Sequence, residues 1–345
     1  MSRRGLTLLL ASMLALLLTS GAVQARVPYV ALGPGPTFNT LGEVDGTPVL
    51  ELEGRRTYET TGHLDLTTVG VQSPLTLAQA VRGWFDRDLA VVPREALYPP
   101  EKSEDEVDRE NAEAMEASQS SATTAAARQL GLRTAQVLVK QVPDGAPAQG
   151  RLRVGDVLTT VDGRAVRDAA DLRTFISRRE VGQPVRIGFE RSGETGTAAV
   201  GTTASDDDEQ RPVIGVVTEE EPVDAPFSVA ISLEEVVGPS AGLMFALGIL
   251  DKLDEPSLTG GKYIAGTGEI TRDGTVRPIG GIPQKLVAAR AKGAVAFLVP
   301  EQNCPEAVLN APDGLLLLEV GSLDDALRGL TALRRDTPPE LCSAA

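Results

Sequence analysis

The sequence predicts an α+β protein of several domains. The chain has 345 residues, which is long enough for two domains or more, and 42% of them are apolar, so most of the chain can bury a core. Stretches in which apolar and polar residues alternate, as they do in strands, occur for example at residues 49–53 and 63–69. Other stretches, such as residues 75–84 and 241–250, have the apolar content of helices.

The composition excludes several classes of function. The net charge of −15 repels a phosphate backbone, and 3% aromatic residues offer little surface for stacking bases, so no nucleic-acid partner is expected. The chain has one histidine, His63, and two cysteines, Cys304 and Cys342, with neither an HExxH nor a CxxC motif. We therefore expect no metal site and no redox site. No GxxxxGK[ST] sequence occurs, so we expect neither a P-loop ATPase nor a cofactor.

Residues 5–25 form an uncharged, leucine-rich run that follows Arg3 and Arg4. At about 1.5 Å per residue, such a helix just spans a hydrocarbon core of about 30 Å. The run is either a single-pass signal anchor, with the arginines in the cytoplasm, or a signal peptide that is cleaved. Both alternatives place the rest of the chain outside the cytoplasm, bound to the cell membrane or secreted. There Cys304 and Cys342 could form a disulfide; the alternative is two unpaired, small apolar residues.

Residues 27–100 are expected to be rich in strands. The alternation in residues 63–69 puts His63 on the exposed side of one of them. Ser103 and Glu106 then form a capping box, which predicts a polar, alanine-rich helix that runs to about residue 130.

The segment from residue 130 to about 203 has a specific order of elements. It contains a strand-like run at residues 137–139, the sequence GDVLTTVDG at residues 155–163, a helix-like run and a last strand. This order resembles a PDZ domain. The resemblance implies that an extended peptide binds by strand addition, with its C-terminal carboxylate on backbone N–H groups. Matched to the family, the carboxylate loop is Leu130, Gly131 and Leu132; the alternative is that the groove packs on a neighbouring domain and binds nothing.

Residues 238–242 read GPSAG and match GxSxG, a nucleophile pattern. The α/β-hydrolases place a histidine after the serine, and none follows His63, so that class is excluded. A chymotrypsin-like order with His63 before Ser240 lacks the glycine-rich context around the serine. The apolar run at residues 241–250 predicts a buried helix with Ser240 at its N-terminus, where free N–H groups stabilise an oxyanion. The alternative is that Ser240 only caps this helix.

Lys285 is a candidate base for this serine. Two glycines and Pro283 predict that a helix begins just before it, and its neighbours Ile282 and Leu286 are apolar. The dipole at a helix N-terminus and burial both disfavour a charged ammonium. The lysine pKa, ordinarily about 10.4, is therefore expected to fall by about 2–4, which would make Lys285 a base near neutral pH. A surface lysine is the alternative.

Three motifs follow one another along the chain: GPSAG at residues 238–242, GTGEI at 266–270 and GGIPQKLVAA at 280–289. In order and spacing they resemble the proteolytic domain of Lon proteases. Together with the N-terminal segment, the PDZ-like segment and the lack of an ATPase motif, they resemble the YlbL-like family of secreted bacterial Lon-type proteases.

The resemblance implies roles for particular residues. Ser240 would be the nucleophile, Lys285 the general base, and Thr267 the threonine that hydrogen-bonds the lysine and orients it. One position departs from the family: many Lon domains have an acidic residue three before the serine, where this chain has Val237. Lon domains commonly form rings, which implies a homo-oligomer.

The implied layout combines an N-terminal membrane segment, a β-barrel-like PDZ module and a Lon-type α/β proteolytic domain. Residues 62–81 resemble the opening strands and helix of a Lon domain, in which case the PDZ domain is inserted into the protease domain. The predicted parts are, in chain order, a signal anchor or signal peptide (1–26), a β-rich N-terminal region (27–100), a polar helix (101–129), the PDZ domain (130–204), the Lon-type serine protease domain (205–335) and a C-terminal tail (336–345).

The sequence thus predicts an extracytoplasmic, ATP-independent serine endopeptidase with a Ser-Lys dyad. Its partners would be unfolded peptides or peptide C-termini, which the PDZ domain would select or present. The alternative is a membrane-tethered PDZ adaptor whose protease domain is inactive.

Overall fold

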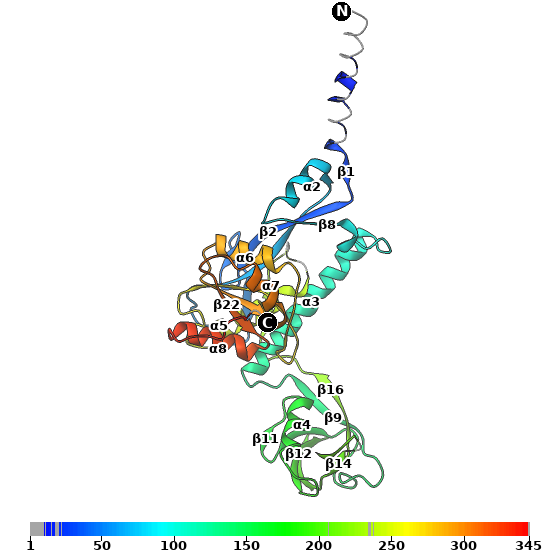
Figure 1. Cartoon of the computed structure of the whole chain (residues 1–345). Helices are drawn as coiled ribbons and strands as arrows, with labels where there is room; N and C mark the ends of the chain where they lie inside the picture. Colours follow the sequence, from blue (N-terminus) through cyan, green and yellow to red (C-terminus); the bar gives the residue numbers. More distant parts are fainter. Residues whose placement is uncertain are drawn as a thin grey trace, which may run out of the picture. The chain divides into compact units, whose positions relative to one another are not determined.

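The structure is a computed structural model of the chain, and it divides into two compact units (Figure 1). The first unit contains residues 1–52, 56–123 and 229–345, and the second contains residues 53–55 and 124–228. Much of the predicted membrane segment lies outside the described residues, and among those described no helix has the length and apolar character needed to cross a membrane. The residues that the structure describes are 10, 12–14, 16–17, 21, 23–205, 207–233, 236 and 238–343.

A six-stranded mixed sheet forms the centre of the first unit, in the order β22-β21-β18-β6-β2-β8. The strands β6, β18, β21 and β22 are parallel to their neighbours in this series, and β2 is antiparallel to both β6 and β8. Residues 27–100 therefore supply strands to the same sheet as the C-terminal third of the chain. The strands are β2 (Tyr29–Asn39), β6 (His63–Gln72), β8 (Ala90–Pro93), β18 (Tyr263–Gly266), β21 (Ala296–Pro300) and β22 (Leu316–Val320).

Helices cover both faces of this sheet, which explains why all five residues of β21 are buried. On one face Ala265 and Phe297 pack against Leu286 of α6. On the other face the side chain of Leu318 lies against α8, and Met244 of α5 lies against the end of β18. Figure 1 shows α5 beside α8 and α6 beside α7. The helices are α5 (Gly242–Leu253), α6 (Ile282–Ala291), α7 (Cys304–Leu309) and α8 (Leu323–Arg334).

Shorter elements complete the first unit. The strand β1 pairs with β7, immediately before the helix α2. Hairpins or short pairs form between β3 and β4, between β5 and β17, and between β19 and β20. These elements are β1 (Arg26–Val27), β3 (Glu43–Val44), β4 (Thr47–Pro48), β5 (Leu50–Glu53), β7 (Leu75–Thr76), α2 (Leu77–Trp84), η1 (Arg94–Ala96), β17 (Ser228–Ile231), η2 (Pro239–Ala241), β19 (Glu269–Ile270), β20 (Val276–Arg277) and η3 (Glu301–Asn303).

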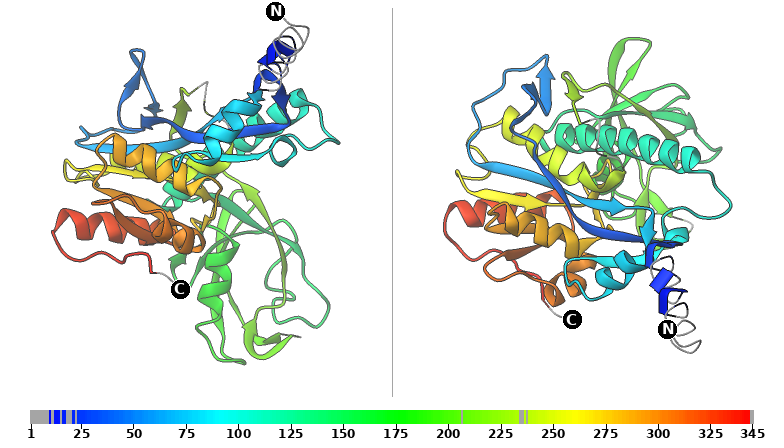
Figure 2. Two further views of the ribbon diagram at one scale, coloured as in Figure 1. Left: turned by 45° about the horizontal axis from the view of Figure 1, so that its top comes forward. Right: turned by 90° about the horizontal axis from the view of Figure 1, so that it is seen from above.

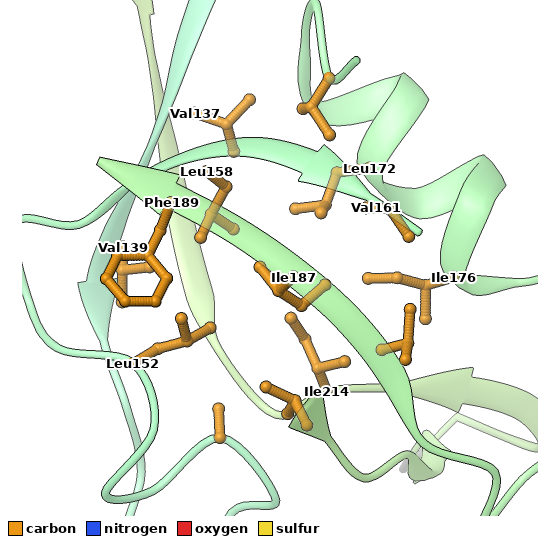
Figure 3. Packing of buried hydrophobic residues seen from close by; sticks show 14 of the residues in the cluster. Val137, Val139, Leu152, Leu158, Val161, Leu172, Ile176, Ile187, Phe189 and Ile214 are labelled. Carbon is orange, nitrogen blue, oxygen red and sulfur yellow. The ribbon is translucent and has the colours of Figure 1, made fainter. Parts of the chain in front are cut away.

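The second unit is built on another sheet, in the order β13-β12-β10-β9-β16, with β11 paired to β10. Figure 3 shows its core, in which Leu172 of α4 packs with Leu158 and Ile187 of the sheet. In the part of the chain that the structure describes, this sheet ends at β13 and β16. The elements are β9 (Ala135–Gln141), β10 (Val157–Val161), β11 (Arg164–Ala165), α4 (Ala169–Ile176), β12 (Val185–Arg191), β13 (Glu194–Val200), β14 (Thr203–Ser205), β15 (Asp208–Val213) and β16 (Val217–Pro222).

Two predicted boundaries differ from the structure. The predicted change of domain after residue 204 falls too early, because β16 pairs with β9 along its whole length and so belongs to the second unit. The residues after 335, predicted as a tail, are held on the first unit: the N–H of Cys342 donates to the carbonyl of Leu317, and a disulfide joins Cys342 to Cys304. The predicted polar helix is α3 (Glu104–Gln129).

Candidate active site

Ser240 lies in η2, one turn before α5, as the GPSAG motif indicates. Its side chain is half-buried. The second glycine of the motif is needed for close packing: a Cβ on Gly242 would lie 2.7 Å from Oγ of Ser118 and 2.9 Å from Cγ2 of Ile270. The backbone N–H of Ser240 belongs to the first turn of η2, where a helix offers no carbonyl partner. It is therefore placed to donate to a developing oxyanion.

Thr267 follows the last residue of β18 and anchors the serine from the sheet side. Its Oγ1 donates to the carbonyl oxygen of Ser240 at 3.0 Å. The next residue, Gly268, donates its backbone N–H to the same oxygen at 2.8 Å. Because two donors hold one carbonyl, the backbone of Ser240 is fixed relative to the carboxyl end of the central strand, where ligands commonly bind in open α/β sheets.

Lys285 reaches the same point from the opposite face of the sheet. It lies in the first turns of α6, and its side chain is 3% exposed. Its Nζ lies 3.0 Å from Oγ of Ser240 and 2.8 Å from Oγ1 of Thr267. Burial lowers the pKa of Lys285 from its ordinary 10.5 to about 7, in the direction and range expected from the sequence.

The three side chains form a consistent hydrogen-bond network when Lys285 is neutral. Thr267 gives its hydroxyl proton to the carbonyl of Ser240, so its oxygen is free to accept an N–H from Lys285. The remaining lone pair of Nζ then faces Oγ of Ser240 and can accept its proton. This is the arrangement that a general base needs: hydrogen-bond distance to the nucleophile and a third group that orients the base.

A cavity of about 420 Å³ opens onto this network. Most of its lining residues are apolar and come from β2, the middle of β6, and the loop before α6, so it can take an extended chain with apolar side groups. Among the described residues, the carboxylate of Glu269 also faces it. The lining residues are Pro36, Phe38, Thr68, Val69, Val236, Pro239, Ser240, Glu269, Pro278, Ile279, Gly280 and Lys285.

The helix α3 supports the segment around Ser240, a role that its polar sequence does not reveal. Oγ of Ser118 donates to the carbonyl of Pro239 at 3.0 Å, and the carbonyl of Asn111 accepts the N–H of Gly238 at 3.2 Å. Figure 2 shows α3 near the start of α5, where a Cβ on Gly242 would touch Ser118. Ser118 is 3% exposed in a helix whose other serines are more exposed, and that burial is visible only in the fold.

We expect Ser118→Ala to slow turnover of a cleaved peptide by about fivefold while KM stays nearly constant, because the lost hydrogen bond is worth about 1 kcal/mol and positions Ser240. The matched control is Ser121→Ala, the same change one turn further along α3. Steady-state kinetics of both variants measure the effect, and equal rates for the two would remove Ser118 from the site.

His63 takes no part in this network. It lies at the start of β6, where it stacks on Tyr263 with ring centroids 4.4 Å apart, and its Nδ1 is 3.7 Å from Asp65. Tyr263 is the first residue of β18, whereas Thr267 follows its last residue. The histidine is thus at the other end of the strand from Ser240. Val237, the position that departs from the Lon pattern, lies outside the described residues.

The predicted carboxylate loop of the second unit is wrong. Leu130, Gly131 and Leu132 form the C-terminal cap of α3, and their backbone N–H groups donate to the carbonyls of Ala126, Arg128 and Ala127. Gly131 has the positive φ, +73°, that is usual for such a cap. With all three donors used, this segment has none to offer a carboxylate.

A better candidate for that loop lies at the start of β16. Ile214, Gly215 and Val216 have the same pattern of apolar residues around a glycine, and their N–H groups donate to no residue that the structure describes. Gly215 has a φ of +69°, and β16 follows at the edge of the sheet, next to α4. The strand-like run after this glycine is the signal that could have distinguished it from Gly131, which follows a helix.

The two cysteines do not form a metal site. Cys304, Glu319 and Cys342 bring ligand atoms within 4.8 Å of one another, but the sulfurs are bonded to each other and so offer no thiolate.

Two segments of the chain match known protein families. Residues 113–202 match the PDZ domain, and residues 235–325 match the C-terminal proteolytic domain of Lon protease (S16). The chain is therefore a mixed α/β protein that carries a PDZ domain and a Lon-type proteolytic domain, and the second match contains Ser240, Thr267 and Lys285.

Individual relatives are similar over parts of the chain. Lon protease 2 of Bacillus subtilis is 36% identical over 90 residues, which cover 26% of this chain and 16% of that protein. The Lon protease of Azospirillum brasilense is 38% identical over 105 residues, covering 30% and 12%. The chain thus spans about a sixth or less of these relatives. The PDZ domain of the SdrC-like protein from Listeria monocytogenes is 30% identical, covering 24% of this chain and 85% of that one, with a TM-score of 0.23.

Proposed function

We propose that this chain is a serine endopeptidase in which Ser240 is the nucleophile and Lys285 the general base. The observation that carries the proposal is the distance of 3.0 Å between Nζ and Oγ, together with the burial that lowers the lysine pKa to about 7. A lysine that is half neutral at pH 7 can take a proton from a hydroxyl, whereas an exposed lysine cannot. No P-loop sequence occurs among the 345 residues, so we propose that cleavage needs no ATP.

The geometry supports the following sequence of steps. Neutral Lys285 takes the proton of Ser240 as Oγ attacks the carbonyl carbon of the peptide bond, and the N–H of Ser240 stabilises the oxyanion. The lysine then gives this proton to the leaving nitrogen, the C–N bond breaks, and an ester on Ser240 remains. Lys285 next takes a proton from water, which attacks the ester. The C–O bond breaks, the acid leaves, and Ser240 regains its proton from the lysine.

We propose that the PDZ domain binds the end of a peptide substrate along β16. Its free edge can add an extended strand, and the N–H groups of Ile214, Gly215 and Val216 can receive a carboxylate. At the other end of β16, Glu220 accepts a hydrogen bond from the N–H of Ala169, which ties the strand to the start of α4.

We further propose that residues 5–25 anchor the chain in a bacterial cell membrane with both units outside the cytoplasm, as in the YlbL-like family that the sequence resembles. The positively charged flank and the apolar run support the orientation, and the disulfide between Cys304 and Cys342 supports an oxidising compartment. The homo-oligomer implied by the Lon resemblance stays a prediction.

The test is cleavage of a mixed library of unfolded peptides by the full chain, read by mass spectrometry, with Ser240→Ala beside it. We expect cleavage by the parent alone, at bonds flanked by apolar residues because the cavity is apolar. Cleavage by both proteins would show a contaminating or different active site. Peptide binding by both without any cleavage would favour the adaptor function instead.

A further inference from the structure

The helix α2 packs in an unusual way: its small residues face the protein and its large apolar residues face outward. Ala80 and Gly83 are buried against the sheet, where Ala80 joins Ala31 and Leu75. The outward face, called here the α2 face, is apolar over its whole length. It consists of Leu77, Val81, Trp84 and Phe85, which are 39%, 40%, 54% and 86% exposed.

A surface of this kind indicates a partner. Leu77, Val81 and Trp84 lie at helical spacings of four and three residues, so they share one side of the helix, and Phe85 extends that side at the C-cap. A soluble protein normally turns such a face toward its core and leaves polar residues outside.

The backbone places the α2 face beside the end of the apolar N-terminal run. The N–H of Leu77 donates to the carbonyl of Ala25 at 2.9 Å, and β1 pairs with β7, so that Arg26 lies opposite Thr76. Ala25 is the last residue of the uncharged run that begins at residue 5. If that run crosses a bilayer, Ala25 lies at the boundary of the hydrocarbon, and the hydrogen bond holds the first turn of α2 at the same boundary.

We propose that the α2 face lies in the surface of the lipid bilayer, with its four side chains between the head groups and the acyl chains. This inference rests on the proposed membrane anchor. The side-chain types suit that depth, because tryptophan favours the interface and the exposed Arg82 and Arg87 can contact phosphates.

A lipid surface fits this face better than a second copy of the chain does. An eight-residue helix presents far less than the roughly 1,000 Å² that a stable protein interface buries. A bilayer needs no such area, since the anchor would hold α2 at the lipid surface at a high effective concentration. The consequence is an orientation for the first unit: two attachments, at Ala25 and along α2, would restrict how it rotates above the membrane.

Trp84 provides the test, because it is the single tryptophan of the chain. The full chain is reconstituted into vesicles of phosphatidylcholine and phosphatidylglycerol, with and without phosphatidylcholine brominated near the top of its acyl chain. We expect bromine to quench the emission of Trp84 about twofold or more, and acrylamide in the water to quench it weakly. Leu77→Asp with Val81→Asp should remove the bromine quenching. Leu309→Asp changes an 83% exposed leucine on α7 and should leave it intact.

The possible outcomes distinguish the inference about the α2 face from the proposed membrane anchor and the proposed dyad. A chain that floats with the vesicles while Trp84 stays open to acrylamide and insensitive to bromine would overturn the inference and leave the anchor standing. Protection from acrylamide without bromine quenching would mean that protein covers the face, which also overturns it. A chain that fails to float would overturn the anchor and the inference together. Peptide cleavage, measured on the same samples, tests the dyad independently of all three.

Discussion

Replacing Lys285 with methionine is expected to reduce kcat/KM for a cleaved peptide by at least about a thousandfold. Methionine matches the length of the lysine chain and leaves the buried site filled, but it cannot accept the proton of Ser240. Residual hydrolysis would then depend on the oxyanion donor and on substrate binding alone, because no other base lies within hydrogen-bond distance of Oγ among the described residues. Cleavage of an internally quenched peptide measures the loss.

The matched control is Lys292→Met, which makes the same change at an exposed residue that caps the same helix. It should cleave at the rate of the parent. If Lys285→Met retained a tenth or more of the parent rate, Lys285 would not be the base, and the dyad would have to be abandoned even though the peptidase assignment could stand.

The same substitution is expected to stabilise the folded protein below neutral pH. The pKa of Lys285 is lowered in the folded state from 10.5 to about 7, so the unfolded chain binds more protons between these two values. The destabilisation is complete below about pH 7 and is gone above about pH 10.5. By linkage it amounts to about 5 kcal/mol when complete, and methionine removes it.

Urea unfolding at several pH values measures this effect, with the fluorescence of Trp84 reporting on the first unit. We expect Lys285→Met to be more stable than the parent at pH 6, with a gain that shrinks as the pH rises toward 10.5. An activity that falls while stability rises would mark Lys285 as a residue kept for function. A pH-independent difference would mean that the substitution acts through packing instead.

The residues of the candidate active site could be found from the sequence because local patterns carry them. The second glycine of GPSAG allows α5 to pack closely on Ile270, and the apolar run that follows it predicts a buried helix. The two glycines and Pro283 begin α6 and so place Lys285 in its first turns. The way in which the starts of α5 and α6 meet at the end of β18 is a property of the fold and not of a local pattern. Thr267 was therefore indicated by the family resemblance alone.

The features that the sequence reading missed depend on pairing between distant residues. Leu130, Gly131 and Leu132 have the right composition for a carboxylate loop, but the preceding helix uses their N–H groups. The strand-like run after Gly215 ends in three successive glutamates, Glu219 to Glu221, which are unusual in a strand; β16 includes them because β9 offers backbone partners along its whole length. Long-range partners of this kind leave no periodicity in the sequence. The contact of Ser118 with Pro239, across 121 positions, is a further example.

The central claim is that neutral Lys285 activates Ser240, and its most direct test is the pH dependence of kcat/KM for one peptide across roughly pH 5 to pH 10. This quantity reports the pKa of the base in the free enzyme. The account predicts that kcat/KM rises with pH, with a midpoint near 7, as the lysine loses its proton. A profile that is flat through neutrality, or one that rises only near the ordinary lysine value of 10.5, would contradict it.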